Sequence, residues 1–173
     1  MNLPIWIKEA NPRSILIIRS CQEQMMKKLI DDIYFMLPDI QIDLIVQKGY
    51  TSSTLNVRNE FKYEKTFYNI FNINFLLFKE IRSNKYDAVI IPCSNTSGEG
   101  YLNVKLFSLP IRARSRLLLC SNYNILFFSR RKIVMEYLHT RISRYILVPI
   151  KFVYYYAIYH VLCFYKKLKI NLH

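Results

Sequence analysis

Arg13-Ser-Ile-Leu-Ile-Ile-Arg19 places four aliphatic residues in a row between polar ends. Because side chains in a strand point alternately to its two faces, consecutive apolar residues leave no face for solvent. Such a strand is typical of the middle of a parallel sheet that helices cover on both sides. The run therefore predicts an α/β fold, and with only three glycines the chain is poor in the tight turns of a β-sandwich.

Patterns typical of helices and strands alternate after this run. Apolar residues from 22 to 37 recur every three or four positions, which predicts a helix that ends before Pro38. The next apolar run, 40–46, predicts a second strand and completes a βαβ unit. The further predicted elements are an edge strand at 61–67, helices at 75–82 and 101–111, and strands at 86–92 and 116–120. We therefore expect a Rossmann-like, mostly parallel sheet of about five strands flanked by helices.

The chain has a net charge of +13, and most of it lies in the last third. Residues 1–111 carry 13 Lys and Arg against 11 Asp and Glu, whereas the rest of the chain carries 12 against one. This basic part also holds an apolar run, Tyr145 to Tyr165, with six tyrosines. We expect one Rossmann-like domain at 1–128 and a C-terminal amphipathic and hydrophobic helical tail at 129–173 that associates with an anionic membrane surface.

The apolar run has three alternative arrangements. As a transmembrane helix it would reach about 32 Å, enough to cross a bilayer core, but Pro149, Lys151 and His160 argue against this because a charge near the middle is costly. An in-plane or partly inserted helix, held at anionic lipids by its basic flanks, is favoured, and packing against the body is the third alternative. A groove-binding protein rarely carries such an apolar segment, so no nucleic acid partner is expected. The residues expected at the membrane are Arg141, Arg144, Lys151, Tyr154, Tyr155, Lys166 and Lys167.

Several common kinds of site are missing from the sequence. The turn after the first strand, 19–22, has no glycine, so it lacks the dinucleotide-binding fingerprint and the Walker loop, and no cofactor is expected. The four cysteines are widely spaced, without a Cys-x-x-Cys pair, so no metal is expected. Cys21 has no histidine nearby and is interpreted as a buried spectator thiol rather than a nucleophile. Free thiols and the absence of a secretory signal pattern predict a cytoplasmic body.

Cys93-Ser-Asn-Thr-Ser-Gly-Glu-Gly-Tyr101 is the most distinctive segment of the body and holds two of the three glycines. It follows a predicted buried strand and precedes a predicted helix, so its amide groups are expected to converge where open α/β folds bind ligands. This arrangement predicts a site for a phosphate or a sugar. Glu99 is either a general base or an acid that compensates the helix dipole, and the second interpretation is favoured. The polar residues before it can also be helix caps.

Four segments together resemble a known family. In this order, Ile15-Leu-Ile-Ile-Arg19, Leu37-Pro-Asp39, Ile42-Asp-Leu-Ile-Val46 and Tyr86-Asp-Ala-Val-Ile-Ile91 resemble the N-terminal Rossmann half of GT-B glycosyltransferases of the ADP-heptose:lipopolysaccharide heptosyltransferase type, over about residues 13–120. Ser97-Gly-Glu-Gly-Tyr-Leu-Asn-Val-Lys105 is similar to a pattern in small bacterial proteins of surface-polysaccharide loci. Two features differ from the heptosyltransferases: Cys21-Gln22-Glu23 replaces their Gly-Asp, and their second, nucleotide-sugar domain has no counterpart here.

The resemblance implies a glycosyltransferase-like half-domain of cell-envelope polysaccharide or lipopolysaccharide synthesis. Its expected ligand is a lipid-linked glycan, a nucleotide sugar or another phosphate-containing molecule, bound at the cytoplasmic face of the inner membrane together with a glycosyltransferase partner. The alternative is a non-catalytic membrane adaptor. If the protein transfers a sugar, Glu99 or Glu23 is the expected base. The expected ligand-binding residues are Ser20, Asn95, Ser97, Gly98, Gly100 and Tyr101.

Overall fold

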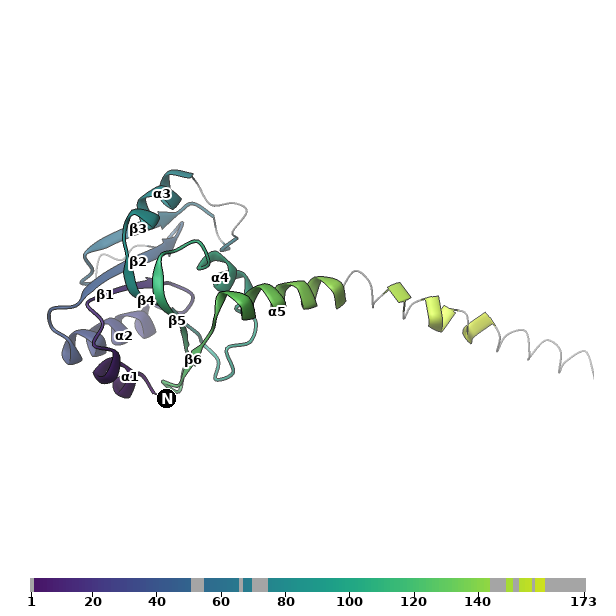
Figure 1. The fold of residues 1–173 in the computed structure, drawn as a ribbon, viewed down its shortest axis with the longest axis horizontal. Helices are drawn as coiled ribbons and strands as arrows, with labels where there is room; N and C mark the ends of the chain where they lie inside the picture. Colours follow the sequence, from purple (N-terminus) through teal and green to yellow (C-terminus); the bar gives the residue numbers. More distant parts are fainter. Residues whose placement is uncertain are drawn as a thin grey trace, which may run out of the picture. The chain divides into compact units, whose positions relative to one another are not determined.

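One six-stranded sheet forms the centre of the part of the chain that is described (Figure 1). The computed structural model describes residues 2–50, 55–65, 67–69, 75–143, 149–150, 153–156 and 158–160. The strand order is β3-β2-β1-β4-β5-β6, with the first five strands parallel and β6 antiparallel to β5. The strands are β1 (Ser14–Ile18), β2 (Gln41–Gln47), β3 (Asn59–Tyr63), β4 (Tyr86–Pro92), β5 (Ala113–Leu119) and β6 (Ile125–Phe127). This order is Rossmann-like, and it reverses direction between β1 and β4.

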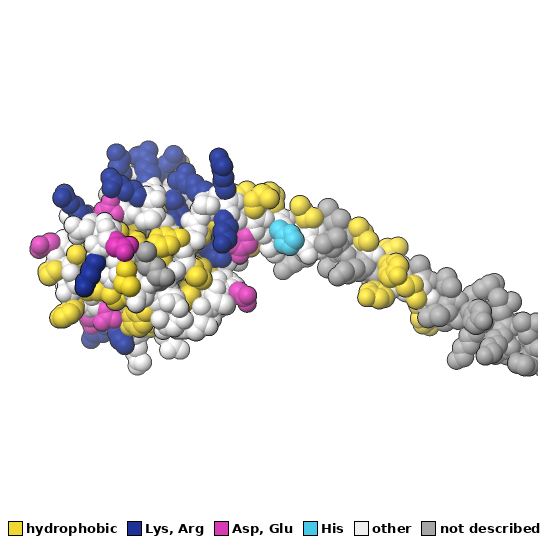
Figure 2. Space-filling model, turned by 60° about the horizontal axis from the view of Figure 1, so that its bottom comes forward, with side chains coloured by type: hydrophobic (Ala, Val, Ile, Leu, Met, Phe, Trp, Pro, Cys, Tyr) yellow, Lys and Arg dark blue, Asp and Glu magenta, His cyan; other side chains and the backbone are white. Residues whose placement is uncertain are grey.

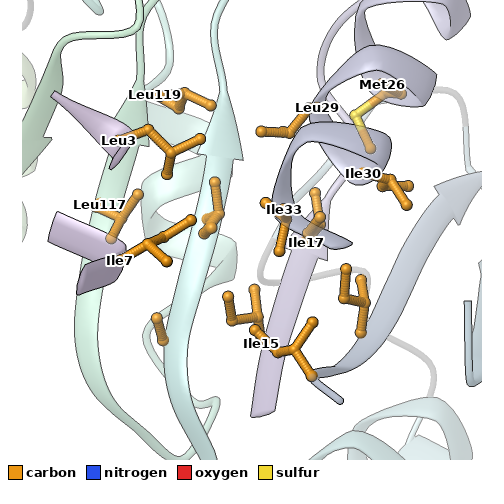
Figure 3. Close-up of a cluster of buried hydrophobic side chains, with 14 of the residues drawn as sticks. Leu3, Ile7, Ile15, Ile17, Met26, Leu29, Ile30, Ile33, Leu117 and Leu119 are labelled. Carbon is orange, nitrogen blue, oxygen red and sulfur yellow. The ribbon is translucent and has the colours of Figure 1, made fainter. Parts of the chain in front are cut away.

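Helices cover both faces of the sheet. α1 (Leu3–Ala10) and α2 (Glu23–Met36) pack on one face, where their buried residues share a cluster with Ile15, Ile17 and Leu117 (Figure 3). α3 (Phe75–Ser83) and α4 (Leu102–Phe107) contribute to the cluster on the other face. α5 (Arg130–Ile142) follows β6.

The four aliphatic residues of β1 divide between these two clusters. Ile15 and Ile17 belong to the first, Leu16 and Ile18 belong to the second, and all four side chains have no exposed surface. Complete burial of such a side chain stabilises the fold by about 2 kcal/mol. The prediction of a central strand buried on both faces is confirmed.

The observed elements correspond to those predicted from the sequence, with two additions. The predicted helices and strands between residues 13 and 120 are present, although α4 is shorter than expected and β3 spans Asn59–Tyr63 instead of 61–67. β6 was not predicted, because three residues are too few to show a period, and it brings the sheet to six strands instead of about five. α1 was also not predicted. The sequence signals for this helix are an asparagine at the N-cap, Asn2, and a proline in the first turn, Pro4. In the structure the Asn2 side chain accepts a hydrogen bond from the Ile5 amide.

The chain divides into two compact units, Met1–Ile133 and Val134–His173. In the second unit the described apolar side chains are largely exposed, including Tyr154 and Tyr155 at 62% and 67%. Arg141 is exposed and its Nε donates to the Tyr137 hydroxyl at 3.1 Å. The predicted membrane residues Arg144, Lys151, Lys166 and Lys167 lie outside the described residues. Within the described segments, no helix has the length and apolar character needed to cross a membrane. The domain limits and the membrane role of the tail stay predictions.

A buried polar cluster joins β2, β4 and the start of β3. The Asp43 side chain has no exposed surface, and its Oδ1 and Oδ2 accept hydrogen bonds from Arg58 Nε at 2.9 Å and Nη2 at 2.6 Å. Asn59 Nδ2 donates to Oδ1 at 3.1 Å, and the Tyr86 hydroxyl donates to Oδ2 at 2.8 Å. Burial, followed by the hydrogen bond to this carboxylate, raises the pKa of Tyr86. The hydroxyl therefore stays protonated and remains a donor at neutral pH.

We predict that Asp43→Ala lowers the free energy of unfolding by about 3 kcal/mol, because it leaves the Tyr86 hydroxyl without its acceptor and leaves the Arg58 guanidinium with Gln41 but no carboxylate. The Arg58 side chain is 38% exposed, so water replaces part of the loss. Urea unfolding of the full chain measures the change. The matched control is Asp39→Ala at an exposed aspartate before the same strand, which should change stability by less than about 0.5 kcal/mol. Equal losses in the two variants would show that the cluster contributes nothing specific.

Candidate functional site

A cleft of about 770 Å³ lies at the carboxyl ends of the central strands. This is the edge where an open α/β sheet with reversed strand order binds ligands, because the loops that leave β1 and β4 diverge to opposite faces. The lining residues come from the end of β1 and the start of α2, from the end of β2 and its loop, from the segment after β3, and from the loop and helix after β4. They are Arg19, Ser20, Cys21, Gln22, Glu23, Gln47, Tyr50, Phe67, Tyr68, Ser94, Gly100, Tyr101, Asn103 and Val104.

The cleft brings together four of the residues predicted from the sequence. Ser20 and Glu23 line one side, and Gly100 and Tyr101 line the other. The Ser20 hydroxyl donates to the Pro92 carbonyl at 2.5 Å, so it links the ends of β1 and β4. Glu23 is an exposed residue at the first position of α2. Its carboxylate is the acidic group among the lining residues, and a base for a bound hydroxyl would come from there.

Four other predicted residues, Asn95, Ser97, Gly98 and Glu99, are not among the lining residues. Asn95 holds the loop in shape: its Oδ1 accepts from the Gly98 amide at 2.7 Å, and its Nδ2 donates to the Glu99 carbonyl at 2.9 Å. The Ser97 hydroxyl oxygen accepts from the Glu99 amide at 3.4 Å. These side chains use their hydrogen bonds within the loop. Their proposed ligand contacts stay predictions.

Gly98 and Gly100 both have positive φ, +69° and +82°, but their surroundings differ. A Cβ at Gly98 would lie 2.8 Å from Leu118 Cδ1 and 3.2 Å from Leu126 Cδ1. At Gly100 nothing lies within 4 Å of that position. Gly98 therefore allows the loop to pack directly on β5 and β6. Gly100 supplies only the turn that brings Tyr101 to the cleft.

Tyr101 fixes the cleft side of the loop. Its hydroxyl accepts a hydrogen bond from the Ser94 amide at 2.9 Å and lies 2.9 Å from the Ser94 hydroxyl. The ring is half-buried, so one side of it remains available at the cleft wall. The loop is thus closed by its own side chains before any ligand binds.

Arg19 is one of the lining residues that the sequence analysis did not single out as part of a site. Its side chain follows β1 directly and the residue is only 5% exposed. The Nε donates to the Cys21 carbonyl at 3.4 Å, and the guanidinium carbon lies 3.7 Å from the centroid of the Tyr50 ring. Among the described residues, no carboxylate lies within ion-pairing distance of this guanidinium. The sequence signal that could have identified Arg19 is its position immediately after an apolar strand.

The thiols near the cleft are protonated at neutral pH. Burial raises the pKa of Cys21 to about 11, although the nearby Arg19 lowers it in part. Burial also raises the pKa of Cys93 to about 12. A protonated thiol is a poor nucleophile, which supports the interpretation of Cys21 as a spectator. The prediction that Cys21 is buried is wrong, because the residue is half-buried and lines the cleft. In the segments that the structure describes, no group of three or more His, Cys, Asp or Glu residues is placed to hold a metal ion.

Comparisons with known proteins show no family for this chain. No protein-family model matches it, and no curated protein matches it significantly. A solved structure described as "cmcI-D160 Mg-SAM" is similar over 68% of this chain, with a TM-score of 0.39 and 10% sequence identity. The matched region is 48% of that structure's chain, so this protein spans about half its length. The strand order of the sheet itself shows the Rossmann-like fold.

We predict that Gly98→Ala lowers the free energy of unfolding by about 3 kcal/mol, because a Cβ adds a clash with β5 to the strain of positive φ. Gly100→Ala is the matched control and should cost about 1 kcal/mol, since it adds strain without a clash. Urea unfolding of both variants gives the two values. Similar losses would contradict the close packing of this loop on β5 and β6.

Proposed function

We propose that the cleft binds a phosphate-containing ligand, either a lipid-linked glycan or a nucleotide sugar, and that the protein is a glycosyltransferase-like half-domain of cell-envelope polysaccharide synthesis. The observation that carries the proposal is Arg19, a buried cation at the cleft wall that no carboxylate of the described residues neutralises. The glycan part of the proposal rests on two resemblances, that of the strands to the heptosyltransferases and that of residues 97–105 to small bacterial proteins of surface-polysaccharide loci.

The other buried charges in the described part of the chain are compensated internally. Asp43 pairs with Arg58. The guanidinium of Arg116 donates to four backbone carbonyls, those of Ser108, Leu109, Ile111 and Ala113. Arg19 has one long hydrogen bond and an aromatic ring. Removing a cation from water without an anion is costly, so a bound phosphate would supply the missing charge.

The surroundings of Arg19 suit a phosphate attached to a sugar or a base. A guanidinium can donate two parallel hydrogen bonds to phosphate oxygens, and stacking on the Tyr50 ring fixes its plane. Phe67 is 81% exposed and Tyr50 is 47% exposed, and both line the cleft. These rings offer flat surfaces on which a sugar or a nucleobase can stack. The cleft volume of about 770 Å³ is within the usual range for small-molecule sites.

Catalysis requires a base and a donor site. When the cleft ligand is the lipid-linked acceptor, Glu23 takes the proton from its hydroxyl while a partner glycosyltransferase holds the nucleotide-sugar donor, because the chain resembles one half of a two-domain enzyme. The acceptor oxygen then bonds to the anomeric carbon of the sugar as the bond from that carbon to the nucleoside diphosphate breaks, and the nucleoside diphosphate leaves from the partner. Without that partner the domain binds its ligand and does not transfer a sugar.

The second candidate is a non-catalytic membrane adaptor. It is favoured by the exposed apolar side chains of the described tail, among them Val153 at 65% and Tyr159 at 63%. Large exposed apolar groups in a row are typical of an interaction surface. On this alternative, substitutions in the cleft have no effect, whereas deletion of residues 130–173 abolishes function.

We predict that Arg19→Gln weakens binding of a phosphate-containing ligand at least tenfold, because it removes a charge-assisted hydrogen bond to the phosphate. Calorimetry with a panel of nucleotide sugars, and nanodiscs carrying polyprenyl-phosphate glycans, measures the loss and identifies the ligand class. Arg19→Lys should retain part of the affinity. The control is Arg82→Gln on α3, outside the cleft, which should bind as the parent does. Equal binding by the Arg19→Gln variant and the control would rule out this anion site.

We predict that Glu23→Gln leaves ligand affinity within about twofold of the parent protein, because the carboxylate does not hold the phosphate, and that it lowers sugar transfer at least about a hundredfold. Transfer is measured in membranes that supply the partner enzymes, with Glu99→Gln as the matched control outside the cleft. Unchanged transfer by Glu23→Gln with Arg19-dependent binding intact would mean that the domain binds but does not catalyse. Loss of sugar transfer by Glu99→Gln alone would assign the base to Glu99 in the loop after β4.

A further inference from the structure

A second hollow lies at the opposite end of the sheet, where β4 and β5 begin. Its volume is about 400 Å³. The side chains of Lys85, Arg112, Arg114 and Arg130 line it together with Asp87, and we call these four cations the basic edge. Residues of the basic edge are all exposed. Arg13 adds positive charge beside the basic edge, because it lines an adjoining hollow of about 480 Å³ together with Lys85. Figure 2 shows Lys and Arg side chains gathered along one side of the globular unit.

The charge of the basic edge is not balanced locally. The one lining carboxylate, Asp87, already accepts hydrogen bonds on Oδ2 from the amides of Arg13 at 2.8 Å and Ser14 at 3.1 Å. Its Oδ1 lies 3.8 Å from Arg114 Nη1. Lys85, Arg112 and Arg130 have no ion pair with any residue that the structure describes. Three cations therefore line a shared hollow whose one carboxylate, Asp87, is paired with Arg114.

The path of the chain links the basic edge to the tail. Because β6 runs antiparallel to β5, it carries the chain from the cleft end of the sheet back toward the amino ends of the parallel strands. The Phe128 amide then donates to the Arg116 carbonyl at 3.1 Å, and α5 begins at Arg130 inside the basic edge. Arg131 and Lys132 follow and are exposed. In the sequence, this basic start leads to the apolar run that begins at Tyr145.

We infer that the basic edge is a contact surface for the headgroups of anionic phospholipids. Each basic residue close to an anionic bilayer adds to the attraction, and the surface lies where the chain departs toward its apolar, tyrosine-rich segment. This contact does not depend on the ligand of the cleft. With the basic edge at the membrane, the cleft would lie about 20 Å away along the seven-residue strand β4, and so remain open to a ligand.

The test is a pair of double variants of the full chain. Lys85→Gln with Arg112→Gln removes two cations of the basic edge whose side chains make no ion pair with the described part of the chain. Lys8→Gln with Lys27→Gln removes the same charge from exposed positions on α1 and α2. Vesicles of phosphatidylcholine with about a third phosphatidylglycerol are floated with each protein at low salt, at subsaturating lipid. We expect the first pair to bind about tenfold more weakly than the parent protein, and the control pair to bind within about twofold of it.

Further measurements separate electrostatic attachment from insertion of the apolar segment and from ligand binding in the cleft. The difference between the two pairs should disappear in about 1 M salt, because screening then acts over about 3 Å. Arg19→Gln should bind vesicles as the parent protein does, so failure of the cleft site leaves this inference standing. The inference is overturned if the two double variants bind alike, or if the parent protein does not prefer anionic vesicles. The inference is also overturned if the Lys85→Gln, Arg112→Gln variant loses binding to pure phosphatidylcholine vesicles by the same factor, since the net charge of the headgroups is then not involved.

Discussion

Burial of β1 on both faces is the constraint on which the rest of the structure depends. Its four aliphatic side chains are completely buried, and it pairs in parallel with β2 on one side and β4 on the other. Parallel neighbours require crossover connections, and α2 supplies one of them across the first face. The strand order reverses beside β1, so the loops after β1 and β4 leave in different directions. The cleft is a direct consequence of this arrangement.

The same sheet separates two kinds of positive charge. At the carboxyl ends of the strands a single buried guanidinium, Arg19, faces a cleft with aromatic walls. At the amino ends several exposed cations surround a shallow hollow. A buried cation discriminates between ligands by geometry, because its donors have fixed directions, whereas exposed cations attract any anionic surface. This difference is why we assign a small ligand to one end and a lipid surface to the other.

The loop after β4 shows how far residue types alone can specify a site. Its glycines and polar residues predicted a ligand-binding turn, and the structure places Gly100 and Tyr101 at the cleft. The remaining polar groups bond within the loop, and Gly98 is required by packing on Leu118. Serine, asparagine and glycine serve turns as well as ligands, so composition could not separate the two uses. Only the positions of the neighbouring strands could.

The sequence by itself determined the α/β class, the central strand and most of the helices, because the period of apolar residues is a local property of the chain. It also determined the concentration of positive charge near the C-terminus. The tertiary structure decided which residues meet: Arg19 with Tyr50, Ser20 with Pro92, and Lys85 with Arg112. It also added β6, which pairs with β5 through backbone hydrogen bonds. Three residues are too short for such a strand to show an alternating pattern in the sequence. Contacts between distant segments depend on strand order, and strand order is not encoded in any single segment.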